Sequence, residues 1–332
     1  MSSAGTPFNV LISSAGRRVG LLEAFRQALR DLDKPGRMLA VDCSPLSAAF
    51  HRADAGFLVP RCSESGFVPA ILELCERERV ALIVPTIDPE LPVYARYRSA
   101  FAEVGTKVLV PGDGTVAIGR DKKLTHEWLV AHGLPTVQQW DAAAAPKDLP
   151  FPVMAKPTFG SASIGVGRIG TLAELDAIRD EANVIVQEMA QGLEHTIDLF
   201  IDRAGTCRCA VPRRRLEVRA GEVSKAVTVR SPELERLAMT VAGALPEASG
   251  VLNVQVFLDS ASGRAAIIEL NPRFGGGFPL SLRAGADFPR WVIQETLGLD
   301  CEARNDQWRH GVVMLRYDDA VFTQAADIGL DL

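Results

Sequence analysis

The stretch Ile267-Ile268-Glu269-Leu270-Asn271-Pro272-Arg273 decides the fold that this sequence predicts. Side chains at positions i and i+2 of a strand point to the same face, so Glu269 and Asn271 offer a carboxylate and an amide oxygen side by side. Magnesium in proteins is bound by oxygen atoms of these kinds. Arg273 follows two residues later, and Lys156 lies in a second strand-like stretch far earlier in the chain. The pattern predicts that two remote segments hold magnesium and ATP between them.

The two strands that surround this stretch are predicted over residues 251–258 and 264–271, with a turn-like run between them. If Asp259 lies opposite Ala265 in an antiparallel pair, then Gln255 lies opposite Glu269. Gln255, Glu269 and Asn271 would then share one face and bind magnesium, with Mn²⁺ as an alternative ion. The other face would be filled by Val254, Val256, Ile268 and Leu270. The alternative interpretation is a polar sheet face turned to water.

The composition is that of a globular enzyme rather than of a nucleic-acid or membrane protein. The chain has 332 residues, 47% of them apolar, and a net charge of -5, so we expect a large core and two or three domains. With 6% aromatic residues and no long basic stripe, we expect no nucleic-acid partner. The apolar runs are short and no signal peptide is evident, so we expect a cytoplasmic protein without a membrane partner.

The six cysteines are scattered without a C-x-x-C pair, which argues against a zinc site and against a disulfide framework. We expect reduced and mostly buried thiols. The sequence does not determine the oligomeric state, and a homodimer stays an open alternative because dimers are frequent among soluble enzymes.

The first third of the chain alternates short apolar strands with amphipathic helices, which predicts an α/β fold with a parallel, Rossmann-like sheet. Strands are predicted at 8–12, 38–41, 57–59, 81–84 and 108–110. After the first strand, leucines recur at helical spacing, which predicts a helix. The small residues of the turn 13–20 could receive an anion at a helix start, but the spacing is not G-x-G-x-x-G. A purely structural turn is the alternative.

The run 84–91 places polar residues past the carboxyl end of a buried strand, where open α/β sheets meet ligands. It could line a substrate cleft, or Asp88 and Glu90 could simply begin a helix. A turn cluster at 111–114 indicates a domain boundary, and a helix is predicted from Asp121 to His132.

A predicted strand at 151–156 ends in Lys156 and is followed by the loop Gly160-Ser161-Ala162-Ser163-Ile164-Gly165-Val166-Gly167. Loops of small residues let backbone amides approach phosphate oxygens, although no G-K-[ST] follows and this is not a P-loop. Further strands are predicted at 184–189 and 195–202. A strand ending beside a cleft can bind an adenine edge through its backbone, and Glu194 could accept ribose hydroxyls or be merely solvated. One more strand is predicted at 311–317.

These residues resemble the ATP-grasp superfamily of carboxylate ligases, in the branch that is similar to the carbamoyl phosphate synthase large subunit and biotin carboxylase. The motifs lie at Asp121-Lys122, Ala155-Lys156-Pro157, 160–165, Gln187-Glu188-Met189, Gly192-Leu193-Glu194, Gln255 and 269–273, in the family's order. The resemblance implies an N-terminal Rossmann-like pre-ATP-grasp domain (1–115). It also implies a central α+β subdomain with the glycine-rich loop (116–190) and a C-terminal α+β subdomain with the metal ligands (191–332), which together clasp the nucleotide.

The resemblance also implies roles for individual residues. Lys122 and Lys156 would contact ATP phosphates under a loop that includes Gly160, Ser161, Ala162 and Ser163. Gln187, Glu188 and Met189 would border adenine, the last two binding it through their backbones, and Glu194 would bind ribose. Gln255, Glu269 and Asn271 would carry magnesium. Arg273 would stabilise the transferring phosphoryl group.

The implied chemistry is phosphorylation of a small carboxylate, such as an amino acid, followed by capture of the acyl phosphate by an amine. Lys225, Arg230 and the run 213–215 could orient the substrate carboxylate, or they could form an ordinary cationic strand face. The chain has one unit rather than the two of the synthase, and it lacks a biotin-attachment segment. Two alternatives stay open, namely a unit that phosphorylates bicarbonate or carbamate and a non-catalytic nucleotide sensor.

Overall fold

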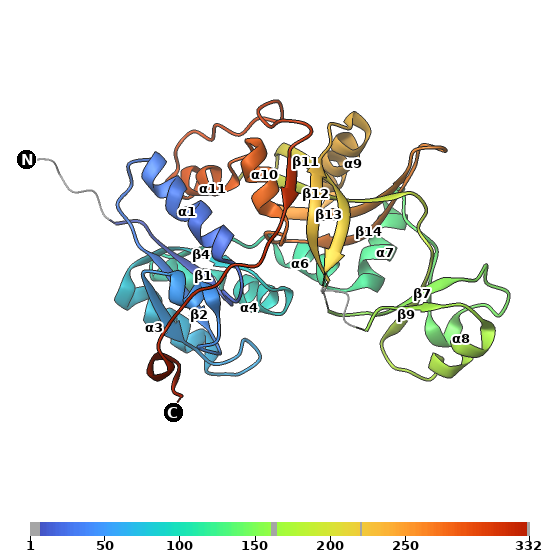
Figure 1. Cartoon of the computed structure of the whole chain (residues 1–332), viewed down its shortest axis with the longest axis horizontal. Helices are drawn as coiled ribbons and strands as arrows, with labels where there is room; N and C mark the ends of the chain where they lie inside the picture. Colours follow the sequence, from blue (N-terminus) through green and yellow to red (C-terminus); the bar gives the residue numbers. More distant parts are fainter. Residues whose placement is uncertain (1–6, 161–164, 220, 331–332) are drawn as a thin grey trace, which may run out of the picture.

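The computed structural model describes residues 7–160, 165–219 and 221–330, and within them the strands form three sheets. The N-terminal lobe contains one sheet, and the rest of the molecule contains a small sheet and a large sheet (Figure 1). The predicted α/β fold class is confirmed. The predicted strands are all present, and their ends differ from the prediction by two residues at most.

The N-terminal sheet is entirely parallel, in the order β3-β2-β1-β4-β5, as the alternation of strands and helices predicted. Its inner strands are mostly apolar and almost entirely buried, as expected where helices cover both faces of a sheet. The strands are β1 (Asn9–Ser13), β2 (Met38–Asp42), β3 (Ala55–Leu58), β4 (Val80–Pro85) and β5 (Lys107–Val108). The helical segments are α1 (Val19–Asp31), α2 (Ala48–Arg52), α3 (Phe67–Glu78), η1 (Asp88–Glu90), α4 (Leu91–Arg96) and α5 (Arg98–Glu103).

The turn between β1 and α1 is held by contacts within the protein. The Gly16 amide donates to the Asp42 carboxylate at 2.9 Å, and the Ser47 hydroxyl donates to the Gly16 carbonyl at 2.9 Å. Gly16 adopts a φ of +46°, which suits glycine in a tight turn. Asp42 therefore fixes the turn, and these contacts favour the structural interpretation of this segment.

The small sheet is antiparallel, in the order β6-β9-β7-β8. Its strands are β6 (Gln139–Asp141), β7 (Val153–Pro157), β8 (Gly167–Ile169) and β9 (Val184–Glu188). The helical segments of this part are α6 (Asp113–Arg120), α7 (Lys122–Ala131), η2 (Ala142–Ala144) and α8 (Leu172–Ile178). Helix α7 begins where predicted because the Asp121 carboxylate accepts the amides of Lys123 and Leu124 as its N-cap.

The large sheet has the order β14-β13-β10-β11-β12-β15, and every neighbouring pair is antiparallel. Its strands are β10 (Leu193–Ile201), β11 (Cys207–Arg219), β12 (Glu222–Thr228), β13 (Gly250–Asp259), β14 (Arg264–Asn271) and β15 (Val313–Leu315). Helix α9 (Pro232–Ala244) buries its apolar side in the same core as this sheet. The short 3-10 helix η3 (Ala325–Ile328) lies near the end of the chain.

Two C-terminal helices, α10 (Phe278–Ala284) and α11 (Phe288–Leu297), pack back onto α1 of the N-terminal lobe. Figure 1 shows them in orange beside the blue helix α1. One continuous core contains Phe25 of α1, Phe274, and Trp291 of α11. The Phe25 and Phe274 rings meet edge to face, with centroids 5.8 Å apart. Residues after 191 thus complete the core of the N-terminal lobe.

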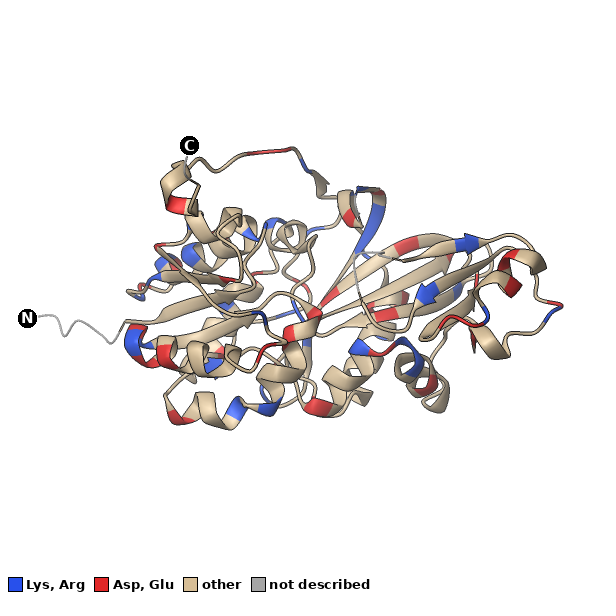
Figure 2. Ribbon diagram, turned by 90° about the horizontal axis from the view of Figure 1, so that it is seen from below, with Lys and Arg blue, Asp and Glu red and all other residues tan. Residues whose placement is uncertain are grey.

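The predicted domain boundaries at 115/116 and 190/191 stay a prediction, although β1–β5, β6–β9 and β10–β15 fall on successive sides of them. Figure 2 shows Lys and Arg interspersed with Asp and Glu over both lobes in that view. In the described part of the chain, the helices are too short and too polar to span a lipid bilayer.

Candidate active site

Two adjoining cavities lie on the side of the large sheet that faces the small sheet and the N-terminal lobe. The first cavity, of about 390 Å³, lies between β7 and β9 of the small sheet and β13 and β14 of the large sheet. The second cavity, of about 240 Å³, lies between the large sheet and Thr86 and Ile87 of the N-terminal lobe. Both are lined by Arg215, Gln255 and Glu269, so the two cavities meet at these side chains.

The structure brings most of the predicted site residues to these two cavities. The first cavity is lined by Lys122, Lys156, Gly160, Gln187, Glu188, Met189, Glu194, Gln255 and Glu269. The second cavity is lined by Gln255, Glu269, Asn271 and Arg273. Ser161, Ala162 and Ser163 lie outside the described residues. The first cavity also has an apolar lining from Met154, Val166, Val218, Phe257 and Ile268. A mixture of apolar walls and a few charged groups is typical of a site for a small ligand.

The two predicted phosphate-binding lysines enter the first cavity from different elements. Lys156 is on β7, and its ammonium donates to the Gln187 side-chain oxygen at 2.7 Å. Burial lowers the pKa of Lys156, and the Glu269 carboxylate opposes this shift. Lys122 is the first residue of α7, and its ammonium donates to the Gly160 carbonyl at 2.8 Å. Two cations thus border the same cavity beside the glycine-rich loop.

The residues predicted to bind the nucleoside already have partners in the protein. Gln187 is buried, and its amide group donates to the Gln139 side chain at 2.7 Å. The backbone amide of Glu188 donates to the Gln138 carbonyl at 3.0 Å, so it is not available for adenine. The Glu194 carboxylate accepts from the Arg215 guanidinium at 2.7 Å. A ribose hydroxyl bound by Glu194 would therefore lie beside an arginine.

The register of the β13–β14 hairpin confirms one part of the prediction and corrects another. Gln255 lies opposite Glu269, as predicted. Asp259 lies opposite Arg264 and not opposite Ala265, so that part of the prediction is wrong. The two observations are reconciled by a bulge, because Val256 pairs with Ile267 and Ile268 is the extra residue.

The bulge also changes which isoleucine lies in the core. Ile267 is fully buried with Val254, Val256 and Leu270, whereas Ile268 lines the first cavity. The prediction that Ile268 fills the buried face is therefore wrong. A bulge re-aims a side chain, and here it adds an apolar group to the cavity beside Glu269.

The three predicted metal ligands lie together in the lining of the second cavity. Glu269 is partly buried, and this burial raises the pKa of its carboxyl while Lys122 opposes the shift. Gln255 directs its NH₂ group to the Glu269 carboxylate at 2.6 Å and its oxygen towards Arg215 at 3.2 Å. Gln255 would have to turn its amide over to offer an oxygen beside Glu269.

The predicted metal ligands could hold magnesium only if phosphate oxygens supply further ligands. Among the described residues, no group of three His, Cys, Asp or Glu side chains could hold a metal ion. The three predicted ligands include one carboxylate, Glu269, and the amide oxygen of Asn271 two residues along the same strand. Magnesium commonly binds through one or two carboxylates while substrate phosphates supply further oxygens. A partly buried carboxylate that lines the same cavity as two lysines is suited to a metal that arrives with a nucleotide.

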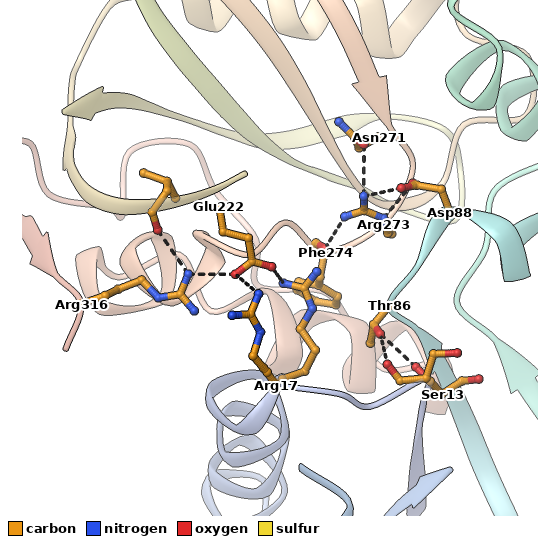
Figure 3. Close-up of polar contacts among 12 residues, drawn as sticks. Ser13, Arg17, Thr86, Asp88, Glu222, Asn271, Arg273, Phe274 and Arg316 are labelled. Carbon is orange, nitrogen blue, oxygen red and sulfur yellow. Dashed lines mark hydrogen bonds and ion pairs between the residues drawn. The ribbon is translucent and has the colours of Figure 1, made fainter. Parts of the chain in front are cut away.

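Arg273 is held at the boundary between the two lobes. Its guanidinium donates to both oxygens of Asp88, at 2.7 and 2.5 Å, and to the Asn271 side-chain oxygen at 3.2 Å (Figure 3). Both partners of this ion pair are largely buried. Burial lowers the pKa of Arg273, but the Asp88 carboxylate more than offsets this, so the pKa is raised. The arginine stays charged and fixed beside Asn271.

Two residues predicted to be catalytic lie elsewhere. Lys225 is on β12 and forms an exposed ion pair with Glu217 at 2.6 Å. The Arg230 guanidinium stacks on the Trp308 ring at 3.5 Å and donates to the Trp308 and Asn305 carbonyls. Neither residue lines the first or second cavity. The physical reason is that each has a local partner which holds it away from the cavities.

Other members of the cationic run do reach the site. Arg213 is buried, forms a two-pronged ion pair with Asp198 at 2.7 and 2.8 Å, and lines the second cavity. Its remaining NH₂ group has no hydrogen-bond partner in the described structure. A Cβ atom on Gly277 would lie 2.2 Å from that group, so only glycine fits here.

Several lining residues were not singled out from the sequence as site residues. Arg18 and Glu222 line the second cavity, and nothing in their local sequence pattern indicates this. Asp88 was considered only as a cleft or helix-start residue, and its role as the partner of Arg273 emerges from the tertiary structure. Thr86 and Ile87, in the run that we considered for a substrate cleft, do line the second cavity.

Comparisons with known proteins agree with this architecture. Residues 10–109 match the family model of the PylC-like N-terminal domain, and residues 180–319 match the model described as ATP-grasp in the biosynthetic pathway with Ter operon. The chain thus contains a PylC-like N-terminal domain followed by a single ATP-grasp unit.

Two curated relatives and one solved structure illustrate the similarity. The chain is 25% identical over 288 residues to the carbamoyl phosphate synthase large chain of Deinococcus radiodurans, covering 78% of this chain and 28% of that protein. It is 24% identical over 257 residues to the phosphoribosylamine–glycine ligase of Salmonella typhimurium, covering 66% of this chain and 59% of that protein. The chain thus spans less than two thirds of either relative.

The solved structure is the biotin carboxylase domain of Hydrogenobacter thermophilus 2-oxoglutarate carboxylase, in complex with MgADP, ADP and bicarbonate. It superposes with a TM-score of 0.71 at 16% identity and covers 93% of this chain and 74% of that one. At this identity the likeness establishes the fold alone.

Proposed function

We propose that this protein is an ADP-forming ligase that phosphorylates a small carboxylate with ATP and joins the acyl group to an amine. The observation that carries the proposal is the meeting of Lys156, from the small sheet, with Glu269, from the large sheet, in one cavity. That cavity opens onto a second one that contains Arg273. Phosphoryl transfer needs positioning and charge neutralisation more than a protein nucleophile, and these residues supply both.

The first cavity suits ATP, with its apolar walls around the base and Lys122 and Lys156 at the phosphates. Magnesium held by oxygens of Glu269 and Asn271 would neutralise phosphate charge. In the second cavity, an oxygen of the acid attacks the γ-phosphorus, the bond to the β-phosphate oxygen breaks, and ADP leaves with that bonding pair. Arg273 lies where charge develops on the transferring group.

The amine then completes the reaction. Its nitrogen lone pair attacks the carbonyl carbon of the acyl phosphate, the carbon–oxygen bond to phosphate breaks, and inorganic phosphate leaves with the electrons. The nitrogen releases a proton to solvent or phosphate as the amide forms.

Bicarbonate is a second candidate for the phosphorylated acid. The observation that favours it is the polar lining of the second cavity, in which only Ile87 and Val223 are large apolar residues. Such a site fits a small, strongly hydrogen-bonded anion. In this case carboxyphosphate or carbamoyl phosphate would replace the acyl phosphate.

The deciding experiment is a matrix of small carboxylates and amines, with ADP release and product mass as the two readouts. ADP release that requires both an acid and an amine, with an amide detected by mass, is the expected result. ADP release with bicarbonate and no organic acid would select the second candidate. No ADP formation with any pair would instead point to a nucleotide sensor and would overturn the ligase proposal. The choice between Mg²⁺ and Mn²⁺ follows from repeating the assay with each ion.

The remaining expectations belong to the same proposal. We infer a cytoplasmic enzyme that acts on small molecules, and sedimentation of the purified protein would distinguish a homodimer from a monomer.

A further inference from the structure

A third cavity adjoins the second one. It has a volume of about 380 Å³ and lies between the start of α1, strand β12 and residues 316–321 of the C-terminal segment. Glu222 and Val223 line both the second and the third cavity, so the two meet at these residues. Figure 1 shows the C-terminal segment, in dark red, running from β15 back along the N-terminal lobe. The second cavity therefore adjoins both the first and the third cavity.

Arginines from two remote segments surround Glu222 where the second and third cavities meet. Arg316 donates to the Glu222 carboxylate at 3.1 Å, and Arg18 lies 3.7 Å from its other oxygen. Arg17 approaches the same carboxylate only to 3.9 Å, and its side chain is 76% exposed (Figure 3). Glu222 thus accepts a hydrogen bond from Arg316 and makes longer ion-pair contacts with Arg17 and Arg18. Of these two, Arg17 is the exposed one, so its guanidinium can bind another anion.

We propose that the third cavity binds the amine substrate, and that this amine also carries a carboxylate, as an amino acid does. The carboxylate would pair with Arg17, and the amino nitrogen would lie at Glu222, facing the second cavity. This assignment rests on the proposed ligase function and adds the class of the second substrate and the residues that select it.

The arrangement of charges supports this class of ligand. Arg17 and Glu222 present a cation and an anion side by side, and an amino acid presents the complementary pair at a similarly short separation. Burial raises the pKa of Glu222, but Arg18 and Arg316 more than offset this, so the pKa is lowered and the carboxylate is charged at neutral pH. A charged carboxylate orients an ammonium group by accepting its hydrogen bonds, and it can accept the proton that the nitrogen must lose before its lone pair attacks the acyl phosphate.

The position of Glu222 also determines the side from which the amine nitrogen would approach the acyl phosphate. Because it borders both cavities, a nitrogen bound to it lies at the entrance to the second cavity, next to Arg273 and the site of the acid. The carboxylate of the amine would stay outside, beside Arg17. An amine without a carboxylate would lose the contact with Arg17 and keep only the contact with Glu222.

The test compares amines that differ only in the carboxylate, namely glycine with methylamine and alanine with ethylamine. The acid is the one that supports ADP release in the matrix described above. For the wild type we expect a KM for the amino acid at least tenfold below that for the matching amine, as the loss of a charge-assisted hydrogen bond would give. The variants are Arg17→Ala and Arg17→Glu, with Arg236→Ala as the matched control because Arg236 is exposed on α9 and lines none of these three cavities.

We expect Arg17→Ala to raise the KM for the amino acid roughly tenfold without changing the KM for the matching amine. Arg17→Glu should reverse the preference, so that the amine lacking a carboxylate becomes the better substrate. A reversal cannot arise from partial unfolding, which would lower activity with both amines alike. The control variant should behave as the wild type.

The outcomes separate the two proposals. If the wild type forms an amide but both Arg17 variants keep the wild-type preference, the assignment of the third cavity is wrong and the ligase function stands. The same conclusion follows if the KM of the wild type for methylamine is as low as its KM for glycine. If the wild type forms no amide with any pair, the ligase proposal fails and this assignment fails with it.

Discussion

At the scale of single residues, the site depends on buried charges that are only partly neutralised by the protein. Lys156 and Glu269 border the same cavity, and burial shifts the pKa of each towards its neutral form. A charged group that is poorly compensated by the protein lowers the stability of the fold. A residue that lines a cavity and has a shifted pKa is therefore a candidate for a functional role. The sequence predicted both residues, but their proximity comes from the tertiary structure.

Lys156→Ala and Glu269→Ala should each lower acid-dependent ADP release by roughly 100-fold or more, because each removes a charge that faces the phosphates. Circular dichroism and thermal unfolding should show that both variants remain folded. Lys225→Ala is the matched control, since its ammonium lies on an exposed strand face and pairs with Glu217. Full activity in either site variant would contradict the site assignment.

Glu90 provides a residue-scale prediction about pH. It is fully buried and accepts the Ser13 and Ser14 hydroxyls at 2.7 and 2.8 Å as well as the Thr86 amide at 2.6 Å. Burial raises the pKa of Glu90, and these hydrogen bonds only partly oppose the shift. The folded state therefore binds the Glu90 proton more tightly than the unfolded state, and this contribution to stability is lost as pH rises from the ordinary glutamate value through the raised one.

The measurement compares the free energies of unfolding of the wild type and of Glu90→Gln in urea at pH 5 and pH 8. The free energy of unfolding of the wild type minus that of Glu90→Gln should become smaller as pH rises. The reason is that only the wild type must bury a charge at pH 8. A difference that is constant or that grows with pH would show that the buried charge is fully compensated by its donors.

At the scale of elements, the β13–β14 hairpin determines how the site is lined. Its bulge brings the consecutive side chains of Ile268 and Glu269 to the same first cavity, whereas Ile267 stays in the core. Strand alternation predicted the faces of Gln255 and Glu269 correctly. It could not predict the bulge, because no residue in 264–271 requires an irregular backbone.

The two isoleucines give a matched pair of variants. Ile267→Ala should lower the free energy of unfolding by roughly 2–4 kcal/mol, since it leaves a cavity in a packed core. Ile268→Ala should change stability by less than about 1 kcal/mol and weaken ATP binding about tenfold through lost apolar contact. Urea unfolding and ATP titration are the measurements, and equal destabilisation by both variants would argue against the bulge.

At the scale of the whole molecule, the lobes are joined both by a shared apolar core and by the ion pair of Asp88 with Arg273. The pair connects η1 of the N-terminal lobe to the residues that follow β14 (Figure 3). Removing one partner of a largely buried pair leaves the other charge uncompensated. The position of Arg273 in the site therefore depends on the docking of the two lobes.

Asp88→Asn should lower the free energy of unfolding by roughly 3 kcal/mol. The control is Asp176→Asn, which breaks the more exposed pair with Arg179 on the small sheet's helix and should cost at most about 1 kcal/mol. The double variant Asp88→Asn with Arg273→Met should recover part of the lost stability, since no unpaired charge remains, while staying inactive. Absence of any recovery would mean that the pair acts through contacts other than charge.

Local patterns were enough to predict the α/β class, the parallel N-terminal sheet and the shared face of Gln255, Glu269 and Asn271. These features follow from periodicity and motif spacing, which act over a few residues. Three other features required the folded molecule: Asp88 fixes Arg273, α10 and α11 complete the N-terminal core, and Arg17, Glu222 and Arg316 meet beside the second cavity. Charges distant in sequence find their partners through the packing of whole lobes, which local patterns do not reveal. For the same reason Lys225 and Arg230, which we considered for orienting the substrate carboxylate, are held elsewhere by Glu217 and Trp308.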